Sequence, residues 1–322
     1  MTTLNAETPA IAPPVRDSGP LAGSPRRRRF RLARSISKWL FVLPAVLFVL
    51  IFFGYPIVKN LAMSFQDYTT TTFYTGEAPW VGLQNYVTTV TSSLFSTTML
   101  NTALFTIGSI VLQFAIGLGL ALFFKRNFPL GGFLRSLLLL PWLLPLIASS
   151  AVWKWILDQD SGALNQFLGV FGVQPIPWLV SPSLALIAVI GANVWLGIPF
   201  NTTILYSGLQ GVPEELYEAA ALDGASGPRA FVAVTLPLLR PVLLFVVVTH
   251  VIGSFQLFGQ VFVLTNGGPG DATRTVVQHL YETAFQNFFQ FGAASAMAWV
   301  LFAIILVFSI LQFRLLRGHT EF

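Results

Sequence analysis

The chain has 322 residues and a formal net charge of +5; 54% of its residues are hydrophobic and only 10% are charged. Soluble domains carry roughly a quarter charged residues. A chain this apolar can expose its surface only to lipid, which excludes a soluble protein. With no cysteine and three histidines it has no disulfide framework or thiolate metal site, and we expect no metal site and no catalytic centre.

The first 38 residues predict a disordered, basic cytoplasmic tail. They are rich in Pro, Ser, Thr and Ala and contain the run Arg26–Arg29 shortly before the first apolar stretch. Such a run can bind nucleic acid, but before a first span it more often fixes topology and contacts anionic lipid headgroups. We therefore expect membrane lipid, and no nucleic acid, as its partner. The charged region is too long for a cleaved signal peptide, so the first apolar stretch is predicted to be a retained helix.

Six apolar stretches follow, each close to the roughly 20 residues that cross a bilayer core. They centre on residues 39–57, 101–124, 136–153, 184–205, 241–264 and 291–313. A further apolar segment, 164–180, is interrupted by Pro175 and Pro177 and is predicted to be interfacial. The predicted fold class is therefore all-α, a polytopic membrane protein with six transmembrane helices.

Orientation follows from the lysines and arginines, which concentrate in cytoplasmic loops. With the N-terminus inside, 15 of the 18 fall on the cytoplasmic side. The outer side keeps Lys59, Lys154 and Arg274. An even number of spans then places the C-terminus in the cytoplasm as well.

The inner loop between the fourth and fifth spans, residues 211–241, carries the most specific pattern. Pro213 followed by Glu214 and Glu215 predicts the start of a helix, and Gly224 predicts its end. Four residues recur between them at helical spacing and form a face with small side chains, namely Leu216, Ala219, Ala220 and Asp223. This predicts a short helix that another protein can approach closely.

The same loop resembles the EAA motif of importer-type ABC permeases. Glu218-Ala219-Ala220, Gly224, Val234 and Leu236-Pro237 match its spacing, with Val234 where isoleucine is usual. The resemblance implies a coupling helix that docks in a groove of a separate cytoplasmic ATPase. The residues at that contact would be Glu218, Ala219, Ala220, Asp223 and Gly224.

Shorter strings are typical of the carbohydrate branch of these permeases, similar to the sugar-binding subunit of the maltose transporter. In chain order they are Tyr55-Pro56-Ile57, Gly82-Leu83-Gln84-Asn85-Tyr86, Asn101-Thr102, Pro141 and Pro145 with Trp153, Trp195-Leu196-Gly197 with Pro199-Phe200, and Thr265-Asn266-Gly267-Gly268-Pro269. The resemblance covers about residues 39–317. It implies a permease domain of the ABC importer type I fold in a bacterial plasma membrane, followed by a short cytoplasmic end at 318–322.

The resemblance further implies a non-catalytic permease subunit of an ATP-driven importer for a neutral mono- or oligosaccharide. Its partners would be a second permease, in a heterodimer rather than a homodimer, two ATP-binding cassette subunits and an extracytoplasmic solute-binding protein. None of the four lysines follows a glycine, so the chain lacks a phosphate-binding GxxxxGKS/T loop. We expect ATP and magnesium to be used by the partner ATPase and no cofactor to be bound here.

Three alternatives stay open. A proton-coupled secondary transporter would need an intramembrane carboxylate, and the six predicted spans contain none. A membrane enzyme would need clustered carboxylates or histidines, whereas Asp158 and Asp160 have no base or metal ligand near them in the sequence. An ABC permease for a glycerol phosphate would favour arginines lining a span, and no such cluster occurs.

Polar side chains inside spans face a partner helix or an aqueous path. In span five, His250, Ser254 and Leu257 share a predicted helix face with Gly253 beside them, and in span four Asn201 lies one turn after Gly197. The resemblance implies sugar contacts at Leu196, Gly197, Phe200, His250, Gly253, Ser254 and Leu257, to which we add Asn201.

Structural roles compete with this interpretation. Ser254 could bond to its own helix carbonyl, and His250 could bond to a neighbouring span. Gln113 in span two is predicted to link helices. Pro141 and Pro145 could line a moving gate or only kink span three.

Overall fold

The computed structural model describes residues 40–126, 128–255, 257–286 and 289–317. The predicted tail (1–38) and C-terminal end (318–322) lie outside the described residues, and the domain boundaries stay predictions. The chain divides into two compact units, one ending at Lys59 and the other beginning at Asn60. Within the described ranges the regular structure is helical, and the strand-like pairings are two isolated bridges, Gln66 with Trp80 and Thr69 with Gln290.

The described part of the first unit, from Leu40, is an apolar helix. It belongs to a continuous helical stretch of 25 residues, Leu40–Ser64, which includes a π-helical turn, η1 (Leu50–Gly54), and α2 (Tyr55–Ser64). Its side chains from Leu40 to Val58 are almost all exposed and mostly apolar. This surface suits hydrocarbon rather than water, because lipid tails are as apolar as leucine. The helix extends about two turns beyond the predicted 39–57 span.

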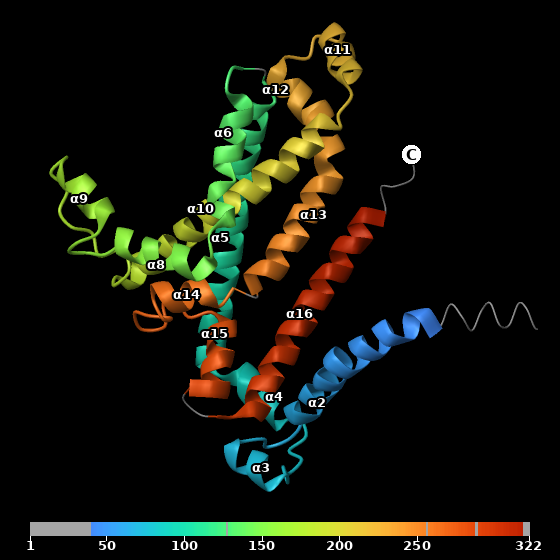
Figure 1. Cartoon of the computed structure of the whole chain (residues 1–322), viewed down its shortest axis with the longest axis vertical. Helices are drawn as coiled ribbons and strands as arrows, with labels where there is room; N and C mark the ends of the chain where they lie inside the picture. Colours follow the sequence, from blue (N-terminus) through green and yellow to red (C-terminus); the bar gives the residue numbers. More distant parts are fainter. Residues whose placement is uncertain (1–39, 127, 256, 287–288, 318–322) are drawn as a thin grey trace, which may run out of the picture. The chain divides into compact units, whose positions relative to one another are not determined.

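Four long helices frame the second unit (Figure 1): α5 (Ser93–Phe124), α10 (Pro182–Gln210), α13 (Leu236–Phe255) and α16 (Phe291–Arg317). α5 and α10 pack most extensively against each other. At Gly117 of α5 an added Cβ would lie 2.8 Å from the Cβ of Asn201 on α10. A residue without a side chain is therefore required for this close approach.

The third predicted span is broken. Residues Gly131–Leu143, comprising α6 (Gly131–Leu138) and α7 (Leu140–Leu143), meet α8 (Leu146–Ile156) at an angle of 94°. Leu144 has an extended backbone with ψ of 139°. The ring of Pro145 disfavours the helical conformation for the residue before it, so the sequence itself forces the break. The predicted kink of span three is therefore present at Pro145, and the described helices give the predicted six spans when the bent pair is counted as one.

The fifth predicted span, 241–264, also has different limits. Its helix starts earlier, because α12 (Gly227–Ala230) and the π-helical turn η2 (Phe231–Thr235) run directly into α13, and it ends at Phe255. Residues Gly259–Leu264 form a separate helix, α14, that packs against α8. Val261 and Leu264 are buried with Phe105 and Val189. Burial of this face therefore decides the direction of α14, which the apolar run alone could not.

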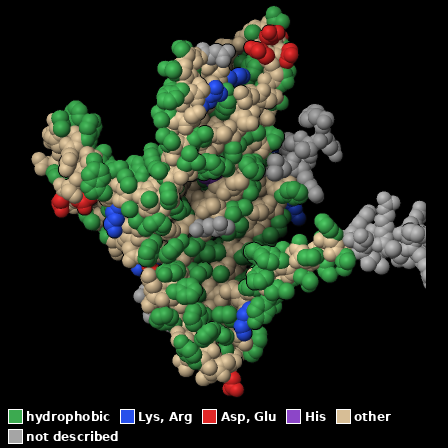
Figure 2. Space-filling model, viewed as in Figure 1, with side chains coloured by type: hydrophobic (Ala, Val, Ile, Leu, Met, Phe, Trp, Pro, Cys, Tyr) green, Lys and Arg blue, Asp and Glu red, His purple; other side chains and the backbone are tan. Residues whose placement is uncertain are grey.

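Five described helices are long and apolar enough to cross a membrane, and six if the bent pair is one span. The remaining helices are short: α3 (Thr70–Thr75), α4 (Gln84–Thr91), α9 (Ala163–Gly169), α11 (Glu214–Leu222), α15 (Val276–Tyr281) and the π-helical η3 (Glu282–Gln286). The visible surface is largely hydrophobic, and acidic side chains gather at the end that carries α11 (Figure 2). α9, in the segment predicted to be interfacial, is too short to span a bilayer.

Candidate functional site

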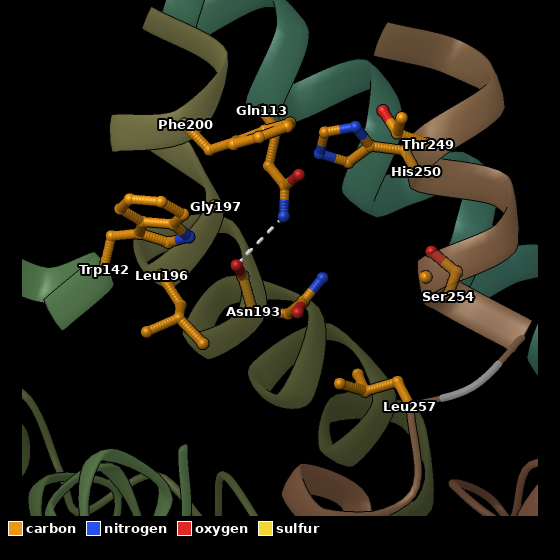
Figure 3. A pocket seen from close by; sticks show the side chains of 11 residues that line it. Gln113, Trp142, Asn193, Leu196, Gly197, Phe200, Thr249, His250, Ser254 and Leu257 are labelled. Atoms are coloured by element: carbon orange, nitrogen blue, oxygen red, sulfur yellow. Dashed lines mark hydrogen bonds between the residues drawn. The ribbon is translucent and has the colours of Figure 1, made fainter. Parts of the chain in front are cut away.

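A cavity of about 310 Å³ lies between α5, α7, α10 and α13 (Figure 3). Its lining residues are Gln113, Trp142, Asn193, Leu196, Gly197, Phe200, Thr249, His250, Gly253, Ser254 and Leu257. Both helix breaks border it, since Trp142 precedes the break at Pro145 and Leu257 follows the end of α13. Non-helical backbone at membrane depth is tolerated where it is buried in protein or lines an aqueous cavity. Both breaks therefore lie where such backbone is tolerated, at the wall of a cavity.

A buried polar network ties the cavity wall together across three helices. The Gln113 Nε2 on α5 donates to the backbone carbonyl of Asn193 on α10 at 2.9 Å, the bond drawn in Figure 3. The Asn201 amide nitrogen lies 2.9 Å from the Gly197 carbonyl oxygen, 3.0 Å from His250 Nε2 and 3.4 Å from Gln113 Oε1. Gln113 thus links helices as predicted, and it also forms part of the cavity wall.

His250 uses both ring nitrogens within the protein. Nε2 accepts from the Asn201 amide, so Nδ1 carries the proton and donates to the Val246 carbonyl oxygen at 2.9 Å. With both nitrogens engaged, the imidazole is neutral and presents its ring, rather than a free donor or acceptor, to the cavity. The predicted alternative, a bond from His250 to a neighbouring span, is therefore present.

The two glycines of the predicted path differ in their surroundings. A Cβ added at Gly197 would lie 2.4 Å from the side chain of Gln113, so this glycine makes room for the glutamine. A Cβ added at Gly253 would meet nothing within 4 Å. Gly253 therefore borders open cavity space, and Gly197 is required for the helix-to-helix hydrogen bond behind it.

Aromatic rings and uncharged polar groups share the cavity surface. The ring centroids of Trp142 and Phe200 are 6.1 Å apart, and those of Phe200 and His250 are 5.9 Å apart. The Thr249 hydroxyl donates to the carbonyls of its own helix. The Ser254 hydroxyl has no hydrogen-bond partner among the described residues, so the predicted back-bond to its helix is not formed there. The lining contains no acidic or cationic side chain.

Seven of the eight residues predicted for the path border this one cavity. Asn201 does not; it is 1% exposed and lies behind the wall, where it holds His250. Leu257 does border the cavity, but from the break after α13 rather than from the same helix face as His250, because the helix ends at Phe255. Their role as a substrate path stays a prediction.

Three further lining residues were not predicted. Asn193 lies one turn before Gly197, and Thr249 directly precedes His250, so helical spacing could have indicated both. Trp142 carried no such signal, because only the 94° break brings α7 beside Phe200.

The predicted coupling helix forms as α11, directly after Pro213, with Glu214 and Glu215 in its first turn. Gly224 has a φ of +73°, and its amide bonds to the Ala221 carbonyl while the Ala225 amide bonds to the Ala220 carbonyl. This pair of bonds is a Schellman end that favours glycine. Ala220 is half-buried; the other residues predicted to contact the ATPase are exposed: Glu218, Ala219, Asp223 and Gly224.

Tyr217 fastens α11 to neighbouring segments of the second unit. Its hydroxyl lies 2.8 Å from that of Thr235, the last residue of η2, and Lys125 Nζ lies 4.2 Å from its ring centroid. On the same short helix, Leu222 is 90% exposed. One side of α11 is therefore held, while the other presents small, acidic and apolar groups without cover from the described chain.

A second polar network lies between α14 and α16. Arg274 pairs with Asp271 at 2.5 Å and with Glu282 at 3.1 Å, and the Gln278 amide donates to Glu282 at 3.0 Å. Burial, with a smaller contribution from the nearby Arg274 cation, lowers the pKa of His279 below its ordinary value. This segment is a compact polar cap on α15 rather than a flexible connection.

The cap is fixed to α5. The Asn101 amide donates to the carbonyls of Asp271 (2.7 Å) and Arg274 (3.1 Å), and the Val276 amide donates to the Thr102 hydroxyl at 3.0 Å. The Asn101-Thr102 string and the segment after Thr265-Asn266-Gly267-Gly268-Pro269, far apart in sequence, are therefore parts of one contact.

Comparison with known proteins identifies the family. Residues 113–319 match the family of binding-protein-dependent transport system inner membrane components. The trehalose/maltose transport system permease protein MalF of Thermococcus litoralis is 34% identical over 88% of this chain and 94% of its own length. The sulfoquinovosyl glycerol transport system permease protein SmoG of Agrobacterium fabrum is 31% identical over 86% of this chain and 89% of its own.

A solved structure supports the same fold. One chain of a bacterial ABC transporter involved in the import of the acidic polysaccharide alginate superposes with a TM-score of 0.78, covering 92% of this chain and all of that one at 20% identity. The predicted all-helical, multi-pass fold of the type I importer class is therefore confirmed, as is a location in the membrane. The chain belongs to the family of binding-protein-dependent transport system inner membrane components, the permease subunits of ABC importers.

Proposed function

We propose that this chain forms half of the translocation path of an ATP-driven importer for a neutral mono- or oligosaccharide. The observation that carries the proposal is the composition of the cavity wall. Aromatic rings at Trp142 and Phe200 can stack on the C–H faces of a sugar, and the uncharged groups of Ser254 and Thr249 can hydrogen-bond its hydroxyls.

The family alone does not select the cargo, because the relatives' names include both trehalose/maltose and sulfoquinovosyl glycerol. The cavity supports a neutral sugar, since no cationic side chain lines it to pair with a phosphate, sulfonate or carboxylate and both nitrogens of His250 are engaged. A buried, unpaired anion would be costly in such a site.

The energy for transport would come from a separate protein. We propose that α11 docks on a separate ATPase that binds ATP and magnesium, with Glu218, Asp223 and Gly224 at the contact. A six-span chain with one such loop supplies one of two docking sites, so a second permease completes the path, and we favour a different chain. A solute-binding protein would deliver the sugar from outside.

The test is uptake of labelled sugars by cells that express the transporter with one cavity residue enlarged. Gly253→Phe places a ring in open cavity space and is expected to abolish uptake while the protein still reaches the membrane. Gly119→Phe on α5 is the matched control, because an added Cβ there also meets nothing within 4 Å but the residue does not line the cavity. Normal uptake by Gly253→Phe would refute the path.

A further inference from the structure

A second pocket with polar lining residues lies between the end of α5, α6 and α10. The helix α6 and the end of α5 lie at the end of the helices that carries α11 (Figure 1). The pocket has a volume of about 270 Å³. Its lining residues are Phe124, Gly132, Arg135, Ser136, Leu138, Leu139, Thr202, Thr203 and Tyr206. Arg135 is the one charged residue among them, and the sugar path described above does not include any of these residues.

Arg135 is held in place by neutral groups. Its Nε donates to the Gly131 carbonyl at 3.2 Å, its Nη1 donates to the Tyr206 hydroxyl oxygen, and its guanidinium carbon lies 4.8 Å from the centroid of the Tyr206 ring. No carboxylate of the described residues forms an ion pair with it. The remaining nitrogen, Nη2, has no acceptor among the described residues. The cation is thus pre-oriented while its charge is not neutralised.

The Tyr206 hydroxyl provides a second hydrogen-bond donor next to the Arg135 guanidinium. Its oxygen accepts from Arg135 Nη1 and, at 3.0 Å, from Gln210 Nε2. With two donors already on that oxygen, the remaining capacity of the phenol is its O–H, which has no acceptor among the described residues. The pocket therefore offers a charged N–H group and an O–H group side by side and no acidic group. This arrangement is complementary to an oxyanion such as phosphate.

The surface around the pocket favours a lipid headgroup over free phosphate as the ligand. Next to the pocket, α6 exposes the apolar side chains of Phe133, Leu134 and Leu137, which acyl chains can cover. Lys125 follows α5 at the same end of the helices, which adds positive charge. Basic pockets between transmembrane helices bind anionic headgroups. A free phosphate would gain nothing from the apolar surface.

We propose that Arg135 and Tyr206 bind the phosphate of an anionic glycerophospholipid in the leaflet on the side of α11. The bound headgroup would join α6 to α10 within two turns of the coupling loop. The site is independent of the sugar cavity and of the cargo that passes through it.

Native mass spectrometry of the purified full chain tests the proposal, with phosphatidylglycerol, phosphatidylcholine and inorganic phosphate as three separate probes. The wild-type chain is expected to retain phosphatidylglycerol in preference to phosphatidylcholine. Arg135→Gln should weaken this binding about tenfold or more, as expected for loss of a charge-assisted hydrogen bond. Tyr206→Phe, which keeps the ring and removes only the O–H, should weaken it about threefold to tenfold.

The matched control is Arg126→Gln, which removes an equal charge from an exposed position of the neighbouring loop and should leave lipid retention unchanged. If Arg135→Gln and Arg126→Gln lost phosphatidylglycerol to the same extent, the lipid would be held by general charge attraction, and the proposed site would be overturned. Displacement of the lipid by millimolar inorganic phosphate would overturn the lipid as its ligand. Retention of phosphatidylglycerol by both Arg135→Gln and Tyr206→Phe would overturn the proposal entirely.

Discussion

Residues of the same type in the cavity wall have different structural roles, which the sequence alone does not reveal. Gly197 and Gly253 lie on facing helices, α10 and α13, yet one is packed against Gln113 and the other faces open space. Asn201 and His250 are both polar and both inside spans, but they bond to each other rather than to a solute. The groups left for a solute include the hydroxyls of Ser254 and Thr249 and the ring faces of Trp142 and Phe200.

Gly197→Ala is predicted to destabilise the chain by about 1–3 kcal/mol, because the new methyl group must displace Gln113 from a well-packed position. Gly253→Ala on the facing helix should not lower stability, since its methyl group meets nothing and alanine favours the helix. Thermal unfolding of the two purified variants in one detergent provides the comparison. Equal unfolding temperatures would show that Gln113 is not fixed in the position described.

At the level of elements, two short segments at opposite ends of the helices are held by specific side chains. α11 is attached through Tyr217 to Thr235 and Lys125. α15 is attached through Thr102 and the Arg274–Glu282 pair. Short helices are marginal by themselves, so these tertiary contacts determine whether each helix forms and where it points.

Tyr217→Phe removes the hydrogen bond to Thr235 but keeps the aromatic ring beneath Lys125, whereas Tyr217→Leu removes both contacts. We expect uptake to fall moderately in the first variant and severely in the second, because a loosely held α11 transmits movement of the ATPase poorly. Initial uptake rates, corrected for the amount of protein in the membrane, measure this. A phenylalanine variant as impaired as the leucine variant would assign the whole effect to the hydrogen bond.

His279 makes the cap around α15 sensitive to acid. Its pKa is lowered in the folded protein, so between that value and the ordinary 6.5 the unfolded chain is protonated while the folded chain is neutral. Stability is therefore complete above about pH 6.5 and declines as the pH falls towards the folded-state pKa. Hydrogen-exchange protection factors of the α15 amides, in which the intrinsic pH dependence of amide exchange is divided out, should fall on acidification in the wild-type chain and less so in His279→Gln. If the wild-type chain and His279→Gln showed the same pH dependence of protection, His279 would not be the source of the acid sensitivity.

At the level of the whole molecule, the proposed import function requires a separate ATPase and a surface on which it can dock. The exposed face of α11, with Glu218 and the 90% exposed Leu222, has no cover from the described residues. In a permease of this family, that face is where we expect a motor subunit to bind.

Purification of the chain with a C-terminal tag in mild detergent should recover an ATPase and a second permease, identified by mass spectrometry. Glu218→Lys, which reverses a charge at the proposed contact, should lose the ATPase while retaining the second permease. Glu77→Lys, in the loop after α3 and away from α11, is the charge-matched control. Recovery of the ATPase with Glu218→Lys would refute the proposed contact, and recovery of a single chain from the unaltered protein would refute the assembly.

The sequence by itself determined the class of this protein, because hydrophobic run length, lysine and arginine placement and the loop motif are local properties. It also predicted the helix from Glu214 to Leu222, whose ends are specified by Pro213 and Gly224. Seven residues of the cavity could be named in advance, since helical spacing and family strings place them on two spans.

Only the tertiary structure decided the rest. The bend at Pro145 brought Trp142 to the cavity, the packing of α14 on α8 ended α13 at Phe255, and the approach of α5 to α10 turned Gly197, Asn201 and Gln113 into a supporting wall. The donor cluster at Arg135 and Tyr206 joins residues 71 apart in sequence. Such features depend on which helices meet, and contacts between distant segments leave no periodic trace in a single sequence.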